Sequence, residues 1–324
     1  GSSVGGSGAV GVGAAVAINI GVLDNTALIG DSAVISGNGV SLIADLRTGE
    51  KNTFSTKSTS GAGASNVGVA GSLAVGTVVS STTAALEGDE SGPGASVNAG
   101  TGNVLIQAGD ATGSTVEAGA KVTGAGDSAK VGVGASISVN VGVNSTVAEV
   151  GNGADISGGN DMALNATSEH LMATTVTGGA TGASVAVTPV AAVSVGINDT
   201  TARLGTGSDL VLTGSYSSQA EQSSEQTTVA TGQTEGSSVS VGASIAVGVA
   251  EDTVTASVER NLTAATDIGV AAVGTSKSDT SATASVKGGK EADDNGDAPA
   301  GQSVDEQVKG QGDAAKDSGK TTST

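Results

Sequence analysis

Catalytic chemistry in this chain would have to use its single histidine, His170, because the sequence contains no cysteine. A Ser–His–Asp arrangement needs a serine at a sharp strand-to-helix turn and a carboxylate that orients the histidine. Ser168 and Glu169 are only chain neighbours of His170, and no serine opens a helix in this way. We therefore expect His170 to be a solvated turn residue. No catalytic residue is predicted, and the chain is not expected to be an enzyme.

Glycine motifs and acidic turns are the other sources of chemistry. GxGxxG-like runs occur, but none opens a helix after a strand, so no nucleotide site is predicted. Carboxylates recur near turns, at Asp24, Asp31, Asp89, Glu90, Asp155, Asp161, Asp199, Asp209, Asp252 and Asp267. Calcium needs six to eight oxygens, but neither the EF-hand spacing nor the calcium-binding nonapeptide occurs. We interpret these residues as solvated turn acids and predict no cofactor, with Ca²⁺ as the alternative left open.

The element that must position all these residues is a strand that recurs five times. Its clearest copy is Val131–Val143, in which valine, isoleucine and alanine alternate with glycine, serine and asparagine. Successive side chains of a strand point to opposite faces, so a period of two indicates a strand with one buried face. We expect the valine side to be buried and the small side chains to face outward.

The five copies are arranged as repeats. They are Val10–Val22, Val67–Val79, Val131–Val143, Val185–Ile197 and Val239–Val249, and each is followed by a second strand-like run and a threonine-rich extended segment. Self-similarity at such a period is typical of repeat proteins, whose units bury their apolar faces only by stacking. Each unit is expected to contain three or four short strands. The predicted fold is all-β: an elongated β-solenoid, similar to a parallel β-helix, of about five repeats.

Composition limits the core and the partners. Aromatic residues make up 1% of the chain, so a thin core of Val, Ala and Ile is expected. The net charge of −19 repels phosphates and anionic membrane surfaces, which argues against nucleic-acid binding. No apolar run is long enough for a transmembrane helix, so no membrane insertion is expected. No signal peptide is visible, and the start without Met suggests a fragment of a longer protein.

The predicted domain boundaries follow the repeats. The solenoid covers residues 1–290, with units at about 1–63, 64–127, 128–182, 183–236 and 237–290. Residues 291–324 are charged and poor in large apolar residues, which predicts an acidic flexible tail with at most a marginal helix around 303–308. A surface loop is expected around Gly92–Gly94. Pro189, taken as inward-facing, is expected to mark a bulge, strand end or edge.

The repeats at 132–158, 185–214 and 241–265 resemble those of large repetitive exported proteins of Gram-negative bacteria, the leukotoxin-family filamentous adhesins and haemagglutinin-like giant proteins. The resemblance covers roughly residues 1–290 and transfers no functional residue. It implies a long β-solenoid that is extracellular or on the bacterial cell surface.

The resulting hypothesis is a structural rod or filament segment of an exported surface adhesin, which mediates attachment or fibre assembly. Its expected partners are copies of itself, neighbouring repeats of the same large protein, or cell-surface glycans. A carbohydrate- or receptor-binding solenoid is the alternative, although only Phe54 and Tyr216 could form aromatic sugar platforms. A polysaccharide lyase would need basic residues clustered with acids, but the arginines Arg47, Arg203 and Arg260 lie in different units.

Overall fold

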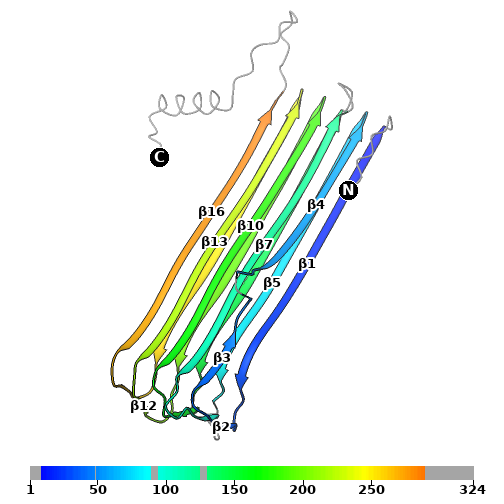
Figure 1. The fold of residues 1–324 in the computed structure, drawn as a ribbon. Coiled ribbons are helices and arrows are strands. Elements are labelled where there is room, and N and C mark those ends of the chain that lie inside the picture. The colour runs from blue at the N-terminus through cyan, green and yellow to red at the C-terminus, as the bar shows by residue number, and fades with distance from the viewer. Residues whose placement is uncertain (1–8, 48, 89–93, 125–129, 289–324) are drawn as a thin grey trace, which may run out of the picture.

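The computed structural model describes residues 9–47, 49–88, 94–124 and 130–288. They form an all-β parallel solenoid of five coils, which confirms the predicted fold class (Figure 1). Each coil contains one long strand, one strand of three residues and a second long strand, the last of which is divided in the first coil. The described residues include no helix.

The strands of the five coils are as follows. The first coil contains β1 (Val10–Ile29), β2 (Val34–Ser36), β3 (Val40–Ala44) and β4 (Asn52–Ala64), and the second contains β5 (Val67–Leu86), β6 (Ser96–Asn98) and β7 (Val104–Gly124). The third contains β8 (Val131–Val150), β9 (Asp155–Ser157) and β10 (Met162–Gly182). The fourth contains β11 (Val185–Leu204), β12 (Leu210–Leu212) and β13 (Tyr216–Gly236), and the fifth contains β14 (Val239–Val258), β15 (Leu262–Ala264) and β16 (Ile268–Lys287).

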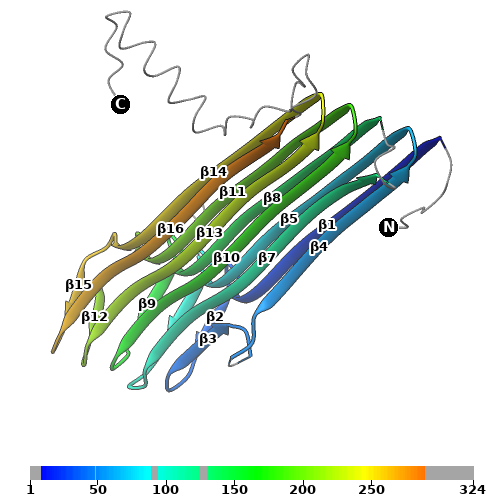
Figure 2. The same cartoon turned by 90° about the horizontal axis from the view of Figure 1, so that it is seen from above.

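Stacking of the coils produces two large parallel sheets that lie one over the other (Figure 2). One sheet has the order β1-β5-β8-β11-β14, and the other has the order β16-β13-β10-β7-β3, with β4 also paired to β7. The register is residue for residue: Val10 pairs with Val67, Val67 with Val131, and Val185 with Val239. The equivalent valine strands of all five repeats therefore form one continuous ladder.

The strands are longer than the sequence predicted. The expected turn after each valine strand does not form: β1, for example, runs without a break from Val10 to Ile29. The second strand-like run and the threonine-rich segment likewise join into one strand, as in β10. Each coil therefore has two long strands and one very short strand, because hydrogen bonding to neighbouring coils keeps these polar stretches extended.

The prediction of which face is buried was wrong. In β8 the inward residues are Gly132, Gly134, Ser136, Ser138 and Asn140, whereas the valines face outward. A Cβ added to Gly132 would lie 2.5 Å from the carbonyl oxygen of Thr181 on the opposite sheet. The two sheets are therefore too close together for large side chains over this stretch, and the small residues form the thin interior in place of valine and isoleucine.

The interior is apolar at both ends of the long strands and polar between them. The largest apolar cluster lies beside the short strands and includes Leu86, Ile106, Leu164 and Leu204. Two smaller clusters lie toward the opposite ends of the strands, around Val116 and Val176 and around residues 62 and 122. Buried asparagine, serine, threonine, histidine and aspartate side chains lie between these clusters.

Pro189 lies within β11, and its side chain is exposed on the outward side, not inward as expected. Pairing with β8 skips residues 188 and 189 and resumes at Val190, whereas pairing with β14 is continuous. The proline therefore interrupts one ladder locally without ending the strand, because it lacks the N–H that this pairing would use. The expected loop residues 92–93 and the tail from 291 onward lie outside the described residues.

Candidate functional site

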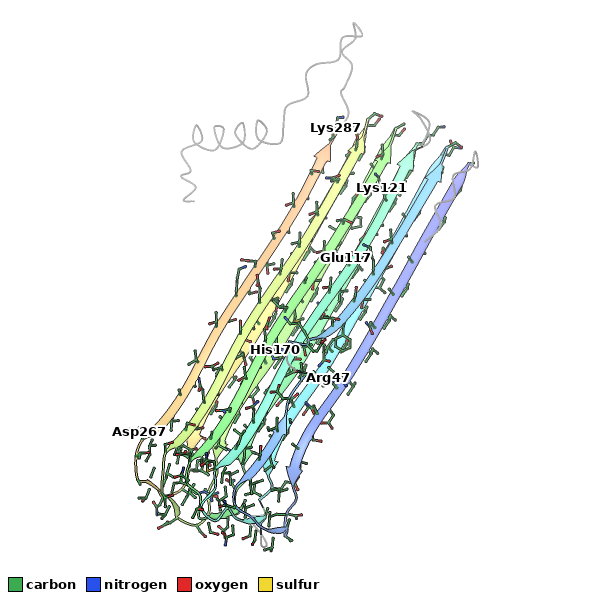
Figure 3. All side chains as sticks on the ribbon, in the orientation of Figure 1. Arg47, Glu117, Lys121, His170, Asp267 and Lys287 are labelled. Carbon is green, nitrogen blue, oxygen red and sulfur yellow. The ribbon has the colours of Figure 1, made fainter. Side chains whose placement is uncertain are left out.

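His170 is not a turn residue. It lies in the middle of β10, its side chain points into the interior, and it is 2% exposed (Figure 3). Neither of its ring nitrogens has a hydrogen-bond partner among the described residues, and Nδ1 lies 4.0 Å from Oδ2 of Asp110. Burial has the largest influence on the pKa of His170 and lowers this pKa, so the imidazole is uncharged at neutral pH. A substrate cannot reach it, so the histidine supports no catalytic site.

A ladder of polar side chains crosses the interior beside His170. Asn144 donates to Asn198 over 2.7 Å, and Asn198 donates to Asp252 over 2.7 Å, which links three successive coils. Asp252 also accepts hydrogen bonds from Gln222 and Ser224. Although burial opposes its charge, the hydrogen bonds that it accepts, from Ser276 foremost, lower its pKa. These polar residues stabilise the stack and leave no open site.

Four asparagines stand two residues before a serine or threonine, the pattern of an N-glycosylation site: Asn144, Asn165, Asn198 and Asn261. Two of them, Asn144 and Asn198, take part in this ladder. Asn144 and Asn198 are each 4% exposed and lie within strands, so neither is accessible for modification in the folded chain. The signal for their structural role is that both occupy the same position of their repeats.

Several of the acidic residues expected in turns accept hydrogen bonds from the protein, whereas Asp24, Asp199 and Asp252 lie within strands and not in turns. Asp161 accepts hydrogen bonds from the backbone N–H and hydroxyl of Ser215, which lower its pKa. Asp209 accepts from Asn261, and Asp155 from the N–H of Ser208. Within the described ranges, no three His, Asp or Glu side chains form a group that could hold a metal ion. Asp89 and Glu90 lie outside those ranges.

The arginines stabilise turns between neighbouring coils. Arg260 donates to the carbonyl oxygens of Gly205, Ala154 and Thr206 over 2.6, 2.8 and 3.0 Å. Arg203 pairs with Glu149 over 2.9 Å. The third, Arg47, is exposed in the segment between β3 and β4 (Figure 3). Although the arginines belong to different units of the sequence, Arg203 and Arg260 come close together, because Arg203 lies 3.6 Å from Glu259 and Arg260 donates to Gly205.

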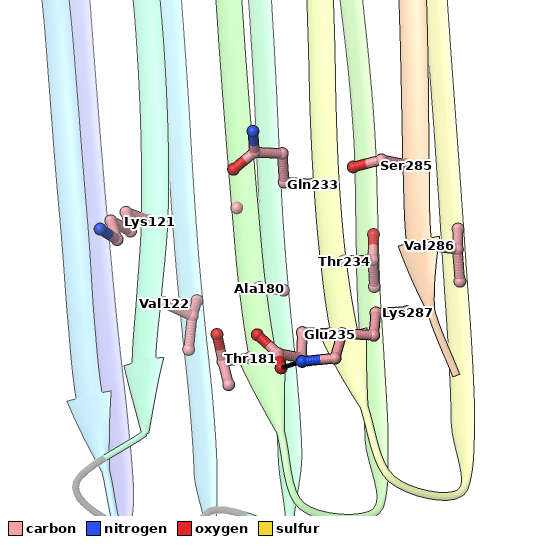
Figure 4. A pocket seen from close by; sticks show the side chains of 11 residues that line it. Lys121, Val122, Ala180, Thr181, Gln233, Thr234, Glu235, Ser285, Val286 and Lys287 are labelled. Carbon is pink, nitrogen blue, oxygen red and sulfur yellow. Dashed lines mark hydrogen bonds and ion pairs between the residues drawn. The ribbon is translucent and has the colours of Figure 1, made fainter. Parts of the chain in front are cut away.

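Neither aromatic residue presents an exposed ring to a sugar, although Phe54 is among the residues that line a hollow of 390 Å³ beside Leu171 and Met172. Tyr216 is 1% exposed, and its burial raises its pKa to about 12. Phe54 points inward, where its ring lies against Gly21 of the opposite sheet. A shallow hollow of 310 Å³ lies at the ends of β7, β10, β13 and β16, where Glu235 and Lys287 form an ion pair of 2.6 Å (Figure 4). Its lining contains no aromatic side chain.

The feature that distinguishes this molecule is its outer apolar surface. We define the valine face as the outward side chains of Val10–Val22, Val67–Val79, Val131–Val143, Val185–Ile197 and Val239–Val249. These positions include no charged residue, and Thr77 is the only polar side chain among them. Exposure reaches 73% at Val22 on the edge strand β1 and falls to 47% at Ile137 and 37% at Val143 on the central strand β8, where neighbouring strands cover the side chains more.

The valine face also has relief. One row across the sheet consists of small or ring-closed side chains, whereas the rows beside it consist of valine, leucine and isoleucine, with Ala191 as the exception. The members of the small row are Ala14, Gly71, Ala135, Pro189 and Ala243. A Cβ added to Gly71 would meet nothing within 4 Å. The row therefore forms a shallow transverse groove between ridges of branched side chains.

The opposite outer surface has the reverse character. We define the polar face as the outward side chains of β4, β7, β10, β13 and β16, where threonine, serine, glutamine and charged residues predominate. Neighbouring strands align lysine with glutamate at Lys57–Glu117, Lys277–Glu225 and Lys287–Glu235, with separations of 2.6 to 2.8 Å. Such exposed pairs contribute little to stability but keep this surface hydrated.

The stack is open at the end formed by β14 and β16. Ile268 and Val270 lie at inward positions of β16, yet they are 53% and 47% exposed because the described chain has no strand that covers them. The outer edges of β1, β14 and β16 have no strand partner among the described residues. Each edge presents about 20 residues of backbone that could pair with another strand.

No known protein family, curated protein or solved structure matches this chain. In the part of the chain that the structure describes, we found no helix that could cross a membrane.

Proposed function

We propose that the chain is a structural rod segment of an exported bacterial surface adhesin, and that it extends by stacking on further coils. The observation that carries this proposal is the open end at β14 and β16. Among the described residues, no strand covers interior positions such as Ile268 and Val270 there, and neither strand edge has a partner, so each can add a parallel strand in the same register.

The interior supports a structural role over a catalytic one. Its one histidine is buried, its polar side chains bond to one another across coils, and its charged turn residues are held by protein donors. A rod built from stacked coils separates a binding site from the surface that bears it, and this role needs length and rigidity without bound cofactors. The extracellular location rests on the resemblance to repetitive exported adhesins.

Electron microscopy of the purified chain tests the rod function. We expect rods that lengthen with protein concentration, because one chain's open end adds to another, with a strand spacing near 4.8 Å along the rod axis. Val270→Lys places a charge on the open end and should shorten the rods. Val273→Lys is the matched control, because Val273 is equally exposed on the same strand but points to the polar face.

Particles that keep the length of a single five-coil chain at every concentration, with or without either substitution, would contradict the rod function. The surface location is tested separately by labelling intact cells of the source organism with antibodies against the chain. Binding to a glycan array by such short particles would instead support the carbohydrate-binding module.

A further inference from the structure

The valine face is large enough to be an interface. Five strands at about 4.8 Å spacing and thirteen residues at about 3.3 Å give a surface of about 24 by 43 Å, or about 1,000 Å². The largest apolar patch of a typical monomer is about 300–600 Å². A standard protein interface takes about 800 Å² from each partner. The face is therefore too large for an ordinary solvated surface and matches one side of a stable interface.

The rest of the chain is not suited to cover the valine face. Residues 289–324 contain only Val304 and Val308 as large apolar side chains among many charged residues, and residues 1–8 contain only Val4. Burying such segments on an uncharged apolar surface would remove charges from water without compensation. The partner must therefore bring its own extended apolar surface.

We propose that the partner is a second copy of this chain, packed face to face through the two valine faces. This inference deepens the proposed structural function, since it names the lateral partner of the rod. The face is regular and carries no charged side chain. The carboxylates nearest to it, Asp24, Asp199 and Glu251, lie on the same outer surface, just beyond the C-terminal end of the face along the strands. Two copies whose strands run antiparallel keep these acidic rows at opposite ends of the interface, where they remain in water.

The shape of the valine face also supports a second copy of the chain as the partner. Packed sheets lie about 10 Å apart with their side chains interdigitated. The groove row that contains Gly71 and Ala135 can receive a ridge of branched side chains from the other copy, such as the row that contains Val69 and Val133 and consists of valine on all five strands. A two-fold axis would make the same contact twice, as expected for an isologous dimer. Four parallel sheets would then form one slab with a polar face on each outer side.

A lipid surface is the competing occupant. The chain's net charge of −19 disfavours anionic membranes but does not prevent contact with uncharged lipid. The experiment therefore includes vesicles of phosphatidylcholine alone, so that an apolar surface without charge is offered to the same face.

Sedimentation velocity over two decades of protein concentration tests the proposal. The wild-type chain should form dimers or larger even-numbered assemblies. Ile137→Lys, in the centre of the valine face, should raise the dissociation constant at least about tenfold, since it would bury an unpaired charge. Thr177→Lys is the matched control. It lies on the polar face, opposite Ser136, whose hydroxyl bonds to its carbonyl oxygen, and should leave association unchanged.

A second measurement does not depend on the folding of a lysine variant. Because the chain has no cysteine, Ile137→Cys and Thr177→Cys each introduce one thiol. At high protein concentration the thiol at 137 should react with a maleimide at least about tenfold more slowly than the thiol at 177, whereas the two should react alike when diluted.

Each outcome is decisive. A wild-type chain that stays unpaired at all concentrations, with equal thiol reactivity, overturns the proposal. Binding to phosphatidylcholine vesicles that Ile137→Lys abolishes, without any pairing in solution, replaces the second copy by a lipid surface. Single rods that lengthen end to end but never pair would refute lateral pairing and leave the rod function standing. Paired particles that never lengthen would refute the rod function and leave lateral pairing standing.

Discussion

A single methyl group added at Gly132 should destabilise the solenoid, whereas the same group added at Gly71 should not. Both glycines lie within long strands of the same sheet, and neither has a positive φ angle. Gly132 points into the interior, and Gly71 lies in the groove of the valine face. Comparing Gly132→Ala with Gly71→Ala therefore tests directly which face of the strand is buried.

The magnitude follows from the separation of the sheets. The new Cβ at residue 132 would lie 2.5 Å from the carbonyl oxygen of Thr181 and 3.1 Å from its carbonyl carbon. An ordinary carbon–oxygen contact is about 3.3 Å or longer, so the sheets must separate by about 0.8 Å locally. Both groups belong to backbones held by ladders on each side. Overpacking of this kind costs about 2–3 kcal/mol of unfolding free energy.

At residue 71 the same substitution meets no atom within 4 Å. It should stabilise the chain by about 0.5 kcal/mol, because alanine restricts the unfolded chain more than glycine does. The two variants should therefore differ by about 3 kcal/mol, or roughly 5 °C or more in unfolding midpoint for a chain of this size.

Circular dichroism at the strand minimum, followed during thermal and urea unfolding, measures this difference. Both variants must be compared at the same protein concentration, because pairing through the valine face would stabilise the folded state. Equal stabilities, or a larger loss for Gly71→Ala, would refute the inward assignment of the glycine side and restore the valine-core interpretation.

Three further predictions follow from single interactions. His170 is the only histidine and has a lowered pKa, so the unfolded chain binds more protons near pH 6.5 than the folded chain, and stability should fall between pH 7.5 and 5.5. His170→Gln should flatten the dependence of the unfolding midpoint on pH over this window; an unchanged slope would contradict this origin. Arg260→Ala removes three hydrogen bonds to carbonyl oxygens and should lower the free energy of unfolding, measured in urea, by about 2 kcal/mol. The control Arg47→Ala, at an exposed residue, should have no effect, and equal losses in the two variants would argue against these bonds. EDTA should leave the unfolding midpoint unchanged, since turn acids such as Asp161 already accept protein donors, and a lower midpoint that calcium restores would reveal a cation site.

Much of the fold could be predicted because its main features recur in all five repeats. The alternation of side chains predicted strands, the five copies predicted stacked coils, and the lack of aromatic residues predicted a thin interior. Strand lengths were underestimated because polar stretches such as Asn198–Arg203 resemble turns when read alone. They remain extended in the solenoid because the next coil pairs with every residue of them.

The prediction placed the valine side of the strands in the interior and the small residues on the surface, which is the reverse of the structure. The sequence nevertheless contained a signal for the correct assignment. Inward positions at the start of the five valine strands hold only small residues: Gly11, Gly68, Gly132, Ala186 and Ser240. Such uniformity across the repeats indicates a limit on size, as expected between closely packed backbones. Outward neighbours are mostly large and branched, because no atom opposes them.

The position of His170 could not be predicted from the local sequence. Its neighbours Ser168 and Glu169 are typical of a turn, yet pairing with β7 and β13 carries the strand through them. Asn144, Asn198 and Asp252 likewise meet only because the coils stack in register.

The sequence by itself determined that this protein forms strands with two chemically different sides, repeated five times and therefore stacked. Alternation alone does not say which side is inside, since exchanging the two sides leaves the pattern unchanged. Only the tertiary structure decided this point. Closing each coil brings two backbones so near to each other that glycine, alanine and serine fit between them, and the valines are left on the outer surface.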